Sequence, residues 1–214
     1  MLVEFEGETG QETQEGKGEQ VSSTGLLGYL VASTSDTGLR TQYHYYGGEQ
    51  GGTPGLFLEE WEGEAPIDGL PGYFTPLSFA LNEPIQLLPA PANVGSLSQW
   101  TYAIEAEATS APITGFVLVY QNGRITDKGK GHTTSTPAGQ LTNGLKISHE
   151  YEQDRSGLGA AGMEGITRAM GTHYYVEGLG LVYEKIEHTA NSDGTGALVE
   201  RTLKSYTGLT PTSP

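Results

Sequence analysis

The chain has 214 residues, which suits one all-β domain with a sizeable buried core and is short for two complete domains. Lys and Arg number 11 against 26 Asp and Glu, and the resulting net charge of −15 opposes binding to nucleic acid and to anionic lipid headgroups. The absence of cysteine excludes disulfides and Cys-ligated zinc, and no apolar run reaches the ~18 residues that a transmembrane helix needs.

The N-terminal stretch is acidic and almost without apolar residues. Residues 4–24 contain six Glu and one Lys. A segment of this composition buries too little surface to offset its ordering entropy, so residues 1–24 are predicted to be a flexible acidic leader. A membrane tether and a disordered terminus would both have this composition. We expect a single β domain over residues 25–207 and a frayed tail over residues 208–214.

The first half of that domain has strand patterns separated by turn residues. Residues 26–33 and 39–46 predict a β-hairpin around the SDTG turn, and residues 73–81 predict a further strand. Residues 82–99 contain Pro84, Pro89 and Pro91. Proline removes a ladder donor, so this stretch is predicted to be an extended crossing segment rather than a central strand.

The second half carries the clearest alternation. Residues 100–108 alternate apolar and polar side chains, and Asn122-Gly123 has the composition of a hairpin turn. Residues 134–152 predict a strand, a Pro-Ala-Gly turn and a second strand with one apolar face and one charged face. The Gly-rich residues 154–170 predict a loop with at most one short helix from about residue 160. Three further strands are predicted at 172–177, 181–188 and 197–206.

An aromatic, apolar face on two of these strands is the candidate binding surface. Tyr is frequent, with 12 residues, and aromatic rings offer wide apolar area with a polar tip. Such a face could hold a hydrophobic small molecule, although packing between strands explains the same residues. The candidate ligand-binding residues are Trp100, Tyr102, Ile104, Leu145, Ile147, His149 and Tyr151.

Catalysis and metal binding have weak sequence support. The five histidines show none of the short spacings that place two metal ligands together, which favours hydrogen-bonded core histidines. His149 could still meet a histidine of a neighbouring strand in a metal site. No Gly-x-Ser-x-Gly motif and no phosphate-binding loop is present. We therefore expect no catalytic residue, no cofactor and no metal.

Four segments in order carry a family resemblance: LLPAPANVGSLSQW (87–100), TSTPAGQLTNGLKI (134–147), YYVEGLGLVYEK (174–185) and LKSY (203–206). Together they resemble a group of bacterial cell-envelope proteins, many of them lipoproteins, that includes the TapB-like proteins. The resemblance covers about residues 80–206. It implies an all-β fold with a strongly curved antiparallel sheet, similar to the half-barrels of periplasmic lipoprotein carriers, and it implies no catalytic residues.

The sequence therefore predicts an exported protein of the cell envelope, periplasm or cell surface that binds a hydrophobic ligand or an envelope partner on a concave β face. Two alternatives remain open. One is a structural subunit of a surface layer or filament that assembles through unpaired edge strands. The other is a His-ligated metalloenzyme of the copper oxidoreductase type, which needs three histidines to converge.

Overall fold

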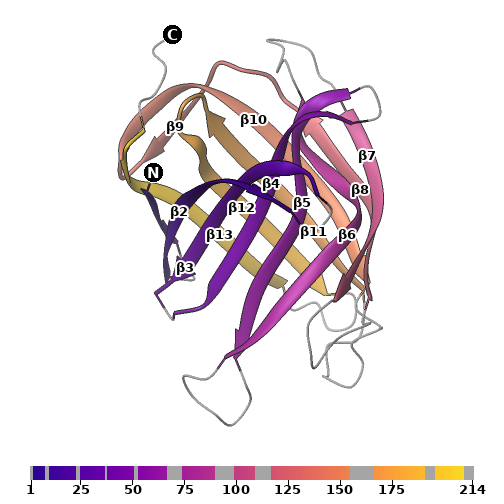
Figure 1. The fold of residues 1–214 in the computed structure, drawn as a ribbon. Coiled ribbons are helices and arrows are strands. Elements are labelled where there is room, and N and C mark those ends of the chain that lie inside the picture. The colour runs from indigo at the N-terminus through magenta and orange to yellow at the C-terminus, as the bar shows by residue number, and fades with distance from the viewer. Residues whose placement is uncertain are drawn as a thin grey trace.

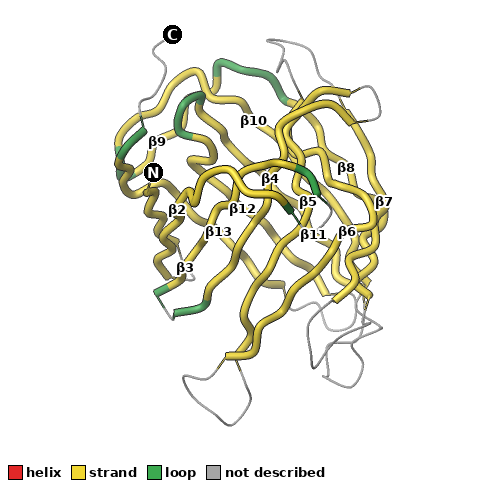
Figure 2. Tube along the Cα trace, viewed as in Figure 1, coloured by secondary structure: helices red, strands yellow, loops and turns green. Residues whose placement is uncertain are grey.

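The computed structural model is a closed antiparallel β-barrel, in which the strands wrap around one axis (Figure 1). It describes residues 2–7, 10–22, 25–36, 38–50, 53–66, 74–89, 99–108, 117–154, 166–190 and 196–209. These residues form strands and short connections, with no helix among them (Figure 2). The strands are β1 (Leu2–Gly7), β2 (Gly10–Val21), β3 (Leu27–Ser35), β4 (Arg40–Gln50), β5 (Thr53–Pro66), β6 (Phe74–Pro89), β7 (Gln99–Ala108), β8 (Val117–Asp127), β9 (His132–Thr136), β10 (Gly139–Asp154), β11 (Ile166–Val176), β12 (Gly180–Ala190) and β13 (Gly196–Thr207).

The all-β prediction is confirmed, but the sheet closes on itself instead of forming an open half-barrel. Twelve strands follow one another around the wall, and the pairing of β10 with β11 completes the circle. The N-terminal strand β1 lies between β13 and β2, so the first and last strands are neighbours in the wall (Figure 1). Because β1 and β2 fill the gap that a half-barrel would leave, the concave face becomes an enclosed lumen.

The predicted flexible leader is wrong, because residues 2–21 supply β1 and β2. Val3 and Phe5 of β1 are 5% and 1% exposed and belong to the core. Both strands also pair on two sides, β1 with β13 and β2, and β2 with β1 and β3. Composition alone misjudges this segment because its stability comes from backbone pairing and two buried side chains, rather than from a large apolar content.

The proline-containing segment is also part of the wall. Residues 82–89 continue β6, which the sequence predicted to end at residue 81. The pairing of β6 with β5 shifts register between Leu58 and Glu60, and residues 81–84 have no partner on β5 there. Pro84 lies in this irregular stretch, where the missing N–H interrupts no ladder bond with β5. Residues 90–98 lie outside the described residues.

Asn122 marks a β-bulge rather than the predicted hairpin turn. Residues 117–127 run through it as one strand, β8, and Asn122 has a φ of 52°. The register of β8 against β7 skips at this point, between Tyr102 and Ile104. Asn tolerates the left-handed region better than most residues, which fits both a turn and a bulge, so the dipeptide alone does not separate them.

The short helix predicted after residue 160 is wrong for the residues that can be compared. Ile166–Val176 form β11, which pairs with β10 along its length. The spacing of Ile166 and Met170 does not mark the buried face of a helix, because both side chains lie on the outside of the wall and are 42% and 55% exposed. The rest of the segment, residues 155–165, is outside the described part, as are residues 210–214 of the predicted tail.

Several other predictions are confirmed. The hairpin of β3 and β4 and the alternating strand β7 lie where their patterns placed them. The Pro-Ala-Gly turn connects β9 to β10, and this hairpin reaches across one end of the barrel, where the Ala138 N–H donates to the Leu203 carbonyl of β13 at 3.3 Å. Ala138 and Leu141 pack there on a buried cluster that includes Val3, Phe5 and Leu203.

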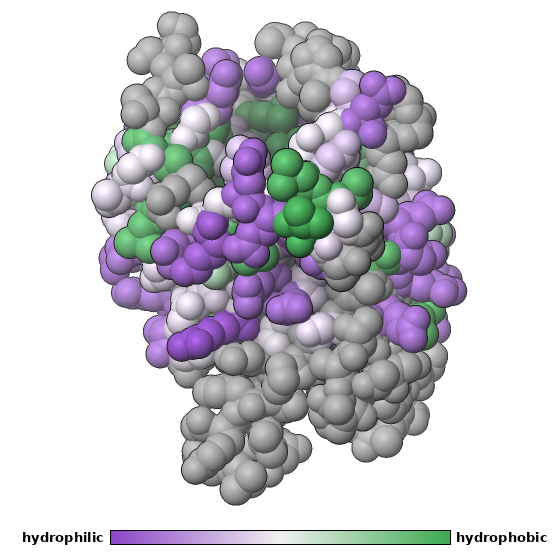
Figure 3. Space-filling model, viewed as in Figure 1, coloured by the Kyte–Doolittle hydropathy of each residue, from purple (hydrophilic) through white to green (hydrophobic). Residues whose placement is uncertain are grey.

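A second buried cluster lies between β6, β7, β8 and β10 and includes Ile104, Ile125 and Ile147. The outside of the wall is mixed, with hydrophilic residues spread over much of the visible face (Figure 3). The two apolar clusters and the inward-facing side chains between them therefore define the interior of the barrel.

Candidate functional site

The lumen contains a main cavity of about 600 Å³. Its lining residues come from β1 to β6 and β10 to β13, so opposite walls of the barrel face the same space. Most of the lining is apolar or aromatic, and these residues include Val3, Phe5, Val31, Tyr43, Tyr45, Leu56, Leu58, Leu87, Leu88, Tyr151, Tyr175, Leu181 and Ile186. The polar exceptions are Gln14, His149, His173, Glu184 and Arg201.

A smaller side cavity of about 410 Å³ adjoins the main one. It extends to β7 and β8, where Tyr102 and Tyr120 line it, together with Trp61 of β5. Side chains that line both cavities form the partition between them: Tyr43, Leu58, Leu87, His149 and Tyr151. The two spaces therefore form one lumen narrowed by five side chains.

A row of polar side chains crosses the apolar wall. We call it the polar row, and in order around the barrel it comprises Glu12, Arg201, Glu184, His173, His149 and Tyr102. Arg201 Nη1 lies 2.6 Å from each carboxylate oxygen of Glu12, and its Nε lies 2.8 Å from Glu184 Oε1. Glu184 Oε2 lies 3.1 Å from His173 Nδ1. This part of the row is thus a chain of close polar contacts along β2, β13, β12 and β11, with β1 between the first two strands.

The other half of the row is a neutral hydrogen bond. The Tyr102 hydroxyl lies 2.5 Å from His149 Nε2, and the rings of His149 and His173 have centroids 5.9 Å apart. Burial lowers the pKa of His149 to about 3, with a smaller contribution from His173, and burial raises the pKa of Tyr102 well above its usual range. The Tyr102 phenol therefore stays protonated, and its O–H can donate a hydrogen bond to Nε2 of the neutral His149 ring.

Charges outweigh burial at Glu184. Burial alone would raise the pKa of this carboxyl, but the Arg201 charge and the contact with His173 lower it to about 2. Burial likewise lowers the pKa of Arg201, and the carboxylates of Glu184 and Glu12 outweigh that effect, so that it rises. The pair is consequently a carboxylate and a guanidinium at neutral pH.

The predicted binding face is brought together only in part. His149 and Tyr151 line both cavities and Tyr102 lines the side cavity. Ile104, Leu145 and Ile147 are 3%, 6% and 2% exposed and pack in a buried cluster. The backbone of Trp100 pairs with Ile125 in β8, and its side chain is outside the described set.

Glu12, Glu184 and Arg201 were missed by the sequence analysis. A signal for Arg201 is present, because it takes the place of an apolar residue between Val199 and Leu203 in an alternating strand. Glu184 similarly stands two residues before Ile186. A charged residue at an apolar position of a strand indicates a buried partner, but its identity depends on the register of distant strands.

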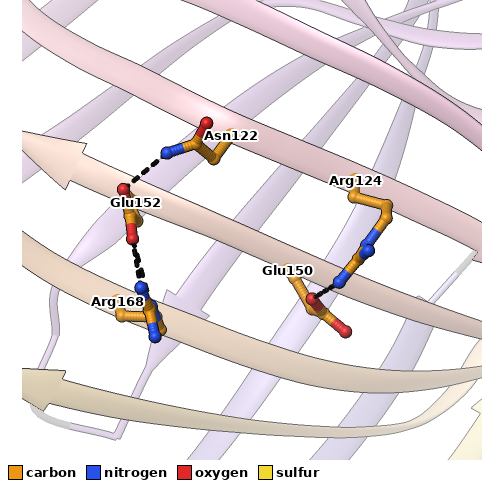
Figure 4. Close-up of polar contacts among 5 residues, drawn as sticks. All are labelled: Asn122, Arg124, Glu150, Glu152 and Arg168. Carbon is orange, nitrogen blue, oxygen red and sulfur yellow. Dashed lines mark hydrogen bonds and ion pairs between the residues drawn. The ribbon is translucent and has the colours of Figure 1, made fainter.

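The outer face of β8, β10 and β11 carries a separate set of charged pairs (Figure 4). Asn122 Nδ2 lies 2.7 Å from Glu152 Oε2, and Arg168 Nε lies 3.1 Å from Glu152 Oε1. Arg124 contacts Glu150 beside them. Arg168 is 63% exposed, so these are ordinary cross-strand pairs of a solvated surface.

Among the residues that the structure describes, no three of the five histidines come together. The described residues contain no group of three or more His, Cys, Asp or Glu side chains suited to a metal ion. His149 does meet a histidine of a neighbouring strand, His173, and the further partners of that pair are Tyr102 and Glu184.

Comparison with known proteins gave no match to any family model, to any curated protein or to any solved structure. Within the described residues, no helix has the length and apolar character needed to cross a membrane.

Proposed function

We propose that this protein binds a hydrophobic small molecule inside its barrel, without catalysis, and that it does so in the cell envelope, the periplasm or at the cell surface. The observation that carries the proposal is the predominantly apolar cavity of about 600 Å³, lined from ten strands. Ligand sites are commonly apolar spaces of ~300–1,000 Å³ with a few placed polar groups.

The shape of the lumen supports a small molecule over a protein segment. Tyr43, Tyr45, Tyr151 and Tyr175 present ring area from three strands, and rings of this kind cover an apolar ligand at low entropic cost. The β9–β10 hairpin packs across one end of the barrel through Ala138 and Leu141. A ligand would thus be surrounded by side chains on most sides, as a carrier or storage protein requires.

The assembly alternative loses its main support, because barrel closure gives each of the twelve wall strands two neighbours. The metalloenzyme alternative finds no three-ligand group among the described residues. The envelope location continues to depend on the resemblance to bacterial envelope proteins, and the net charge of −15 is compatible with it.

Binding of Nile red, a neutral hydrophobic dye, tests the proposal. The wild-type chain should bind the dye with increased fluorescence, and Val31→Trp should reduce binding at least tenfold because Val31 lines the main cavity. Leu56→Trp, on another strand of the cavity, is the second variant should the first fold poorly. Thr34→Trp is the matched control, since Thr34 is exposed on β3. Equal dye binding by all four proteins would overturn the proposal.

A further inference from the structure

The ring of Tyr102 lies flat against the inner wall of the barrel. Tyr102 of β7 pairs with Gly123 of β8, and side chains at paired positions of neighbouring strands point to the same face. A Cβ at Gly123 would lie 2.5 Å from both Cε2 and Cζ of Tyr102 and 2.7 Å from its Cδ2. A point almost equally near to three consecutive ring atoms lies over the face of the ring rather than beyond its edge. The Tyr102 ring therefore covers the place that a side chain at position 123 would occupy.

Two contacts hold this ring in place. One face rests on the buried backbone of Gly123, and the hydroxyl lies 2.5 Å from His149 Nε2 of β10. Because the ring lies between Gly123 and the lumen, and Tyr102 lines the side cavity, its opposite face is turned to that cavity. Tyr102 thus offers a flat, fixed surface, which reduces the cost of binding a stacked ring.

The lining of the side cavity is rich in aromatic rings. Five strands contribute one each: Tyr43, Trp61, Tyr102, Tyr120 and Tyr151. The ring centroids of Trp61 and Tyr120 are 6.2 Å apart, and those of Tyr120 and Tyr151 are 5.6 Å apart, with the rings inclined at 83° and 58°. These rings leave a cavity of about 410 Å³ between them and the rest of the lining. An apolar cavity of ~150 Å³ is enough for benzene, so the side cavity has room for a ring.

The charge of the lining favours a neutral ring over an organic cation, which aromatic faces also attract. None of the described residues that line the side cavity is Asp, Glu, Lys or Arg. The imidazole of His149 is neutral as well, because burial lowers its pKa to about 3. A cation enclosed there would have no counter-charge to offset the loss of its hydration.

We propose that the side cavity binds a planar, uncharged aromatic ring, which stacks on Tyr102, and that the aliphatic remainder of the same molecule lies in the main cavity. This inference rests on the proposed lumen function and specifies its ligand class. Leu58 and Leu87 line both cavities, so a chain that leaves the side cavity meets aliphatic side chains. Val31, Leu56 and Ile186 continue that lining in the main cavity.

The test is calorimetric titration of the full chain with 6-phenylhexan-1-ol and 6-cyclohexylhexan-1-ol. The two compounds have the same carbon count, and the saturated ring is at least as hydrophobic, so apolar burial alone gives the phenyl compound no advantage. Stacking on a fixed ring does. The wild-type chain should therefore bind the phenyl compound about fivefold more tightly than the cyclohexyl compound.

Variants assign that preference to Tyr102. In Tyr102→Leu the ratio of the two affinities should fall to about one, because the ring is gone. Gly123→Ala should lower the ratio as well, since its Cβ displaces the ring, and it gives the same test should the leucine variant fold poorly. Tyr102→Phe keeps the ring without the hydroxyl and should retain the preference. Gly47→Ala is the matched control, because a Cβ at Gly47 meets nothing within 4 Å.

The outcomes separate the two proposals. Equal affinities in the wild type, or tighter binding of the cyclohexyl compound, would overturn the ring inference while leaving lumen binding intact. A phenyl preference that survives Tyr102→Leu would place the ring elsewhere and overturn the inference too. Failure of Nile red and of both compounds to bind the wild type would overturn the lumen function itself.

Discussion

His44 Nδ1 lies 3.0 Å from Glu59 Oε2, and both side chains are 2% exposed although they belong to the outer side of the wall. The end of the β2–β3 hairpin covers them. His44 Nε2 lies 3.0 Å from the Gln20 carbonyl, and the Ser22 hydroxyl donates to Glu59 Oε1 at 2.8 Å. These contacts hold the end of the β2–β3 hairpin against β4 and β5.

Replacing His44 should therefore destabilise the barrel. His44→Phe removes one member of a buried polar pair and leaves the Glu59 carboxylate in the same enclosed site, which should cost about 3 kcal/mol. The free energy of unfolding in urea measures it. The double variant His44→Phe with Glu59→Leu should recover part of the loss, because no carboxyl group is then left in the enclosed site without its histidine partner. A single variant as stable as the wild type would contradict the account.

Among the charged side chains of the lumen, Arg201 should be the one whose replacement lowers the free energy of unfolding most. Arg201→Met leaves the carboxylates of Glu12 and Glu184 facing each other without their cation, for an expected loss of about 3–5 kcal/mol. Arg201→Lys should fall between, since a lysine keeps the charge but not the fork that contacts both partners. Arg168→Met is the matched control on the exposed surface and should leave the urea midpoint unchanged.

Acid should weaken the fold through His149. Its pKa is about 3 in the folded chain against 6.5 for an ordinary histidine, so the unfolded chain binds the additional proton between these values. The contribution is complete above pH 6.5 and is lost as the pH falls toward 3. Glu184 adds to the loss only below about pH 4.5, as its folded pKa is about 2.

His149→Gln separates these two effects, because glutamine keeps an acceptor for Tyr102 but does not titrate. Its unfolding free energy should change little between pH 6.5 and 5, a range over which the wild type should lose on the order of 1–2 kcal/mol. His132→Gln, on β9, should retain the wild-type slope. Parallel slopes for His149→Gln and the wild type would mean that His149 is not the group responsible.

The bulge at Asn122 predicts a residue-specific effect. With φ at 52°, a β-branched side chain should be strained there, so Asn122→Val should cost about 1–2 kcal/mol. Asn122→Gly relieves the backbone and loses only the exposed contact with Glu152, so its thermal midpoint should stay close to that of the wild type. If valine and glycine have equal midpoints, the bulge carries no strain.

The predictable part of this fold is the part written in local periodicity. Leu145, Ile147, His149 and Tyr151 alternate along β10, and that alternation alone placed them on the inner face. Closure of the barrel could not be predicted in this way, because the pairing of Leu2 with Thr207 joins opposite ends of the chain. No local pattern encodes such a register.

The candidate site, too, could be predicted from the sequence only in part. Its apolar wall follows from alternation, whereas the polar row needs β2, β13, β12, β11, β10 and β7 to be in register. Glu12 shows the difficulty, since it stands in a segment with the composition of a disordered tail and meets Arg201, which is 189 residues away. Only the tertiary fold brings these two charges together.

The most direct measurement is a crystal structure of the chain with 11-bromoundecan-1-ol, whose bromine is located by anomalous scattering. The account predicts a bromine peak inside the barrel, in the main cavity that Val31, Leu56 and Tyr175 line. A bromine bound only on the outer wall, or an empty lumen at saturating alcohol, would contradict the proposal that the interior of this barrel is its functional site.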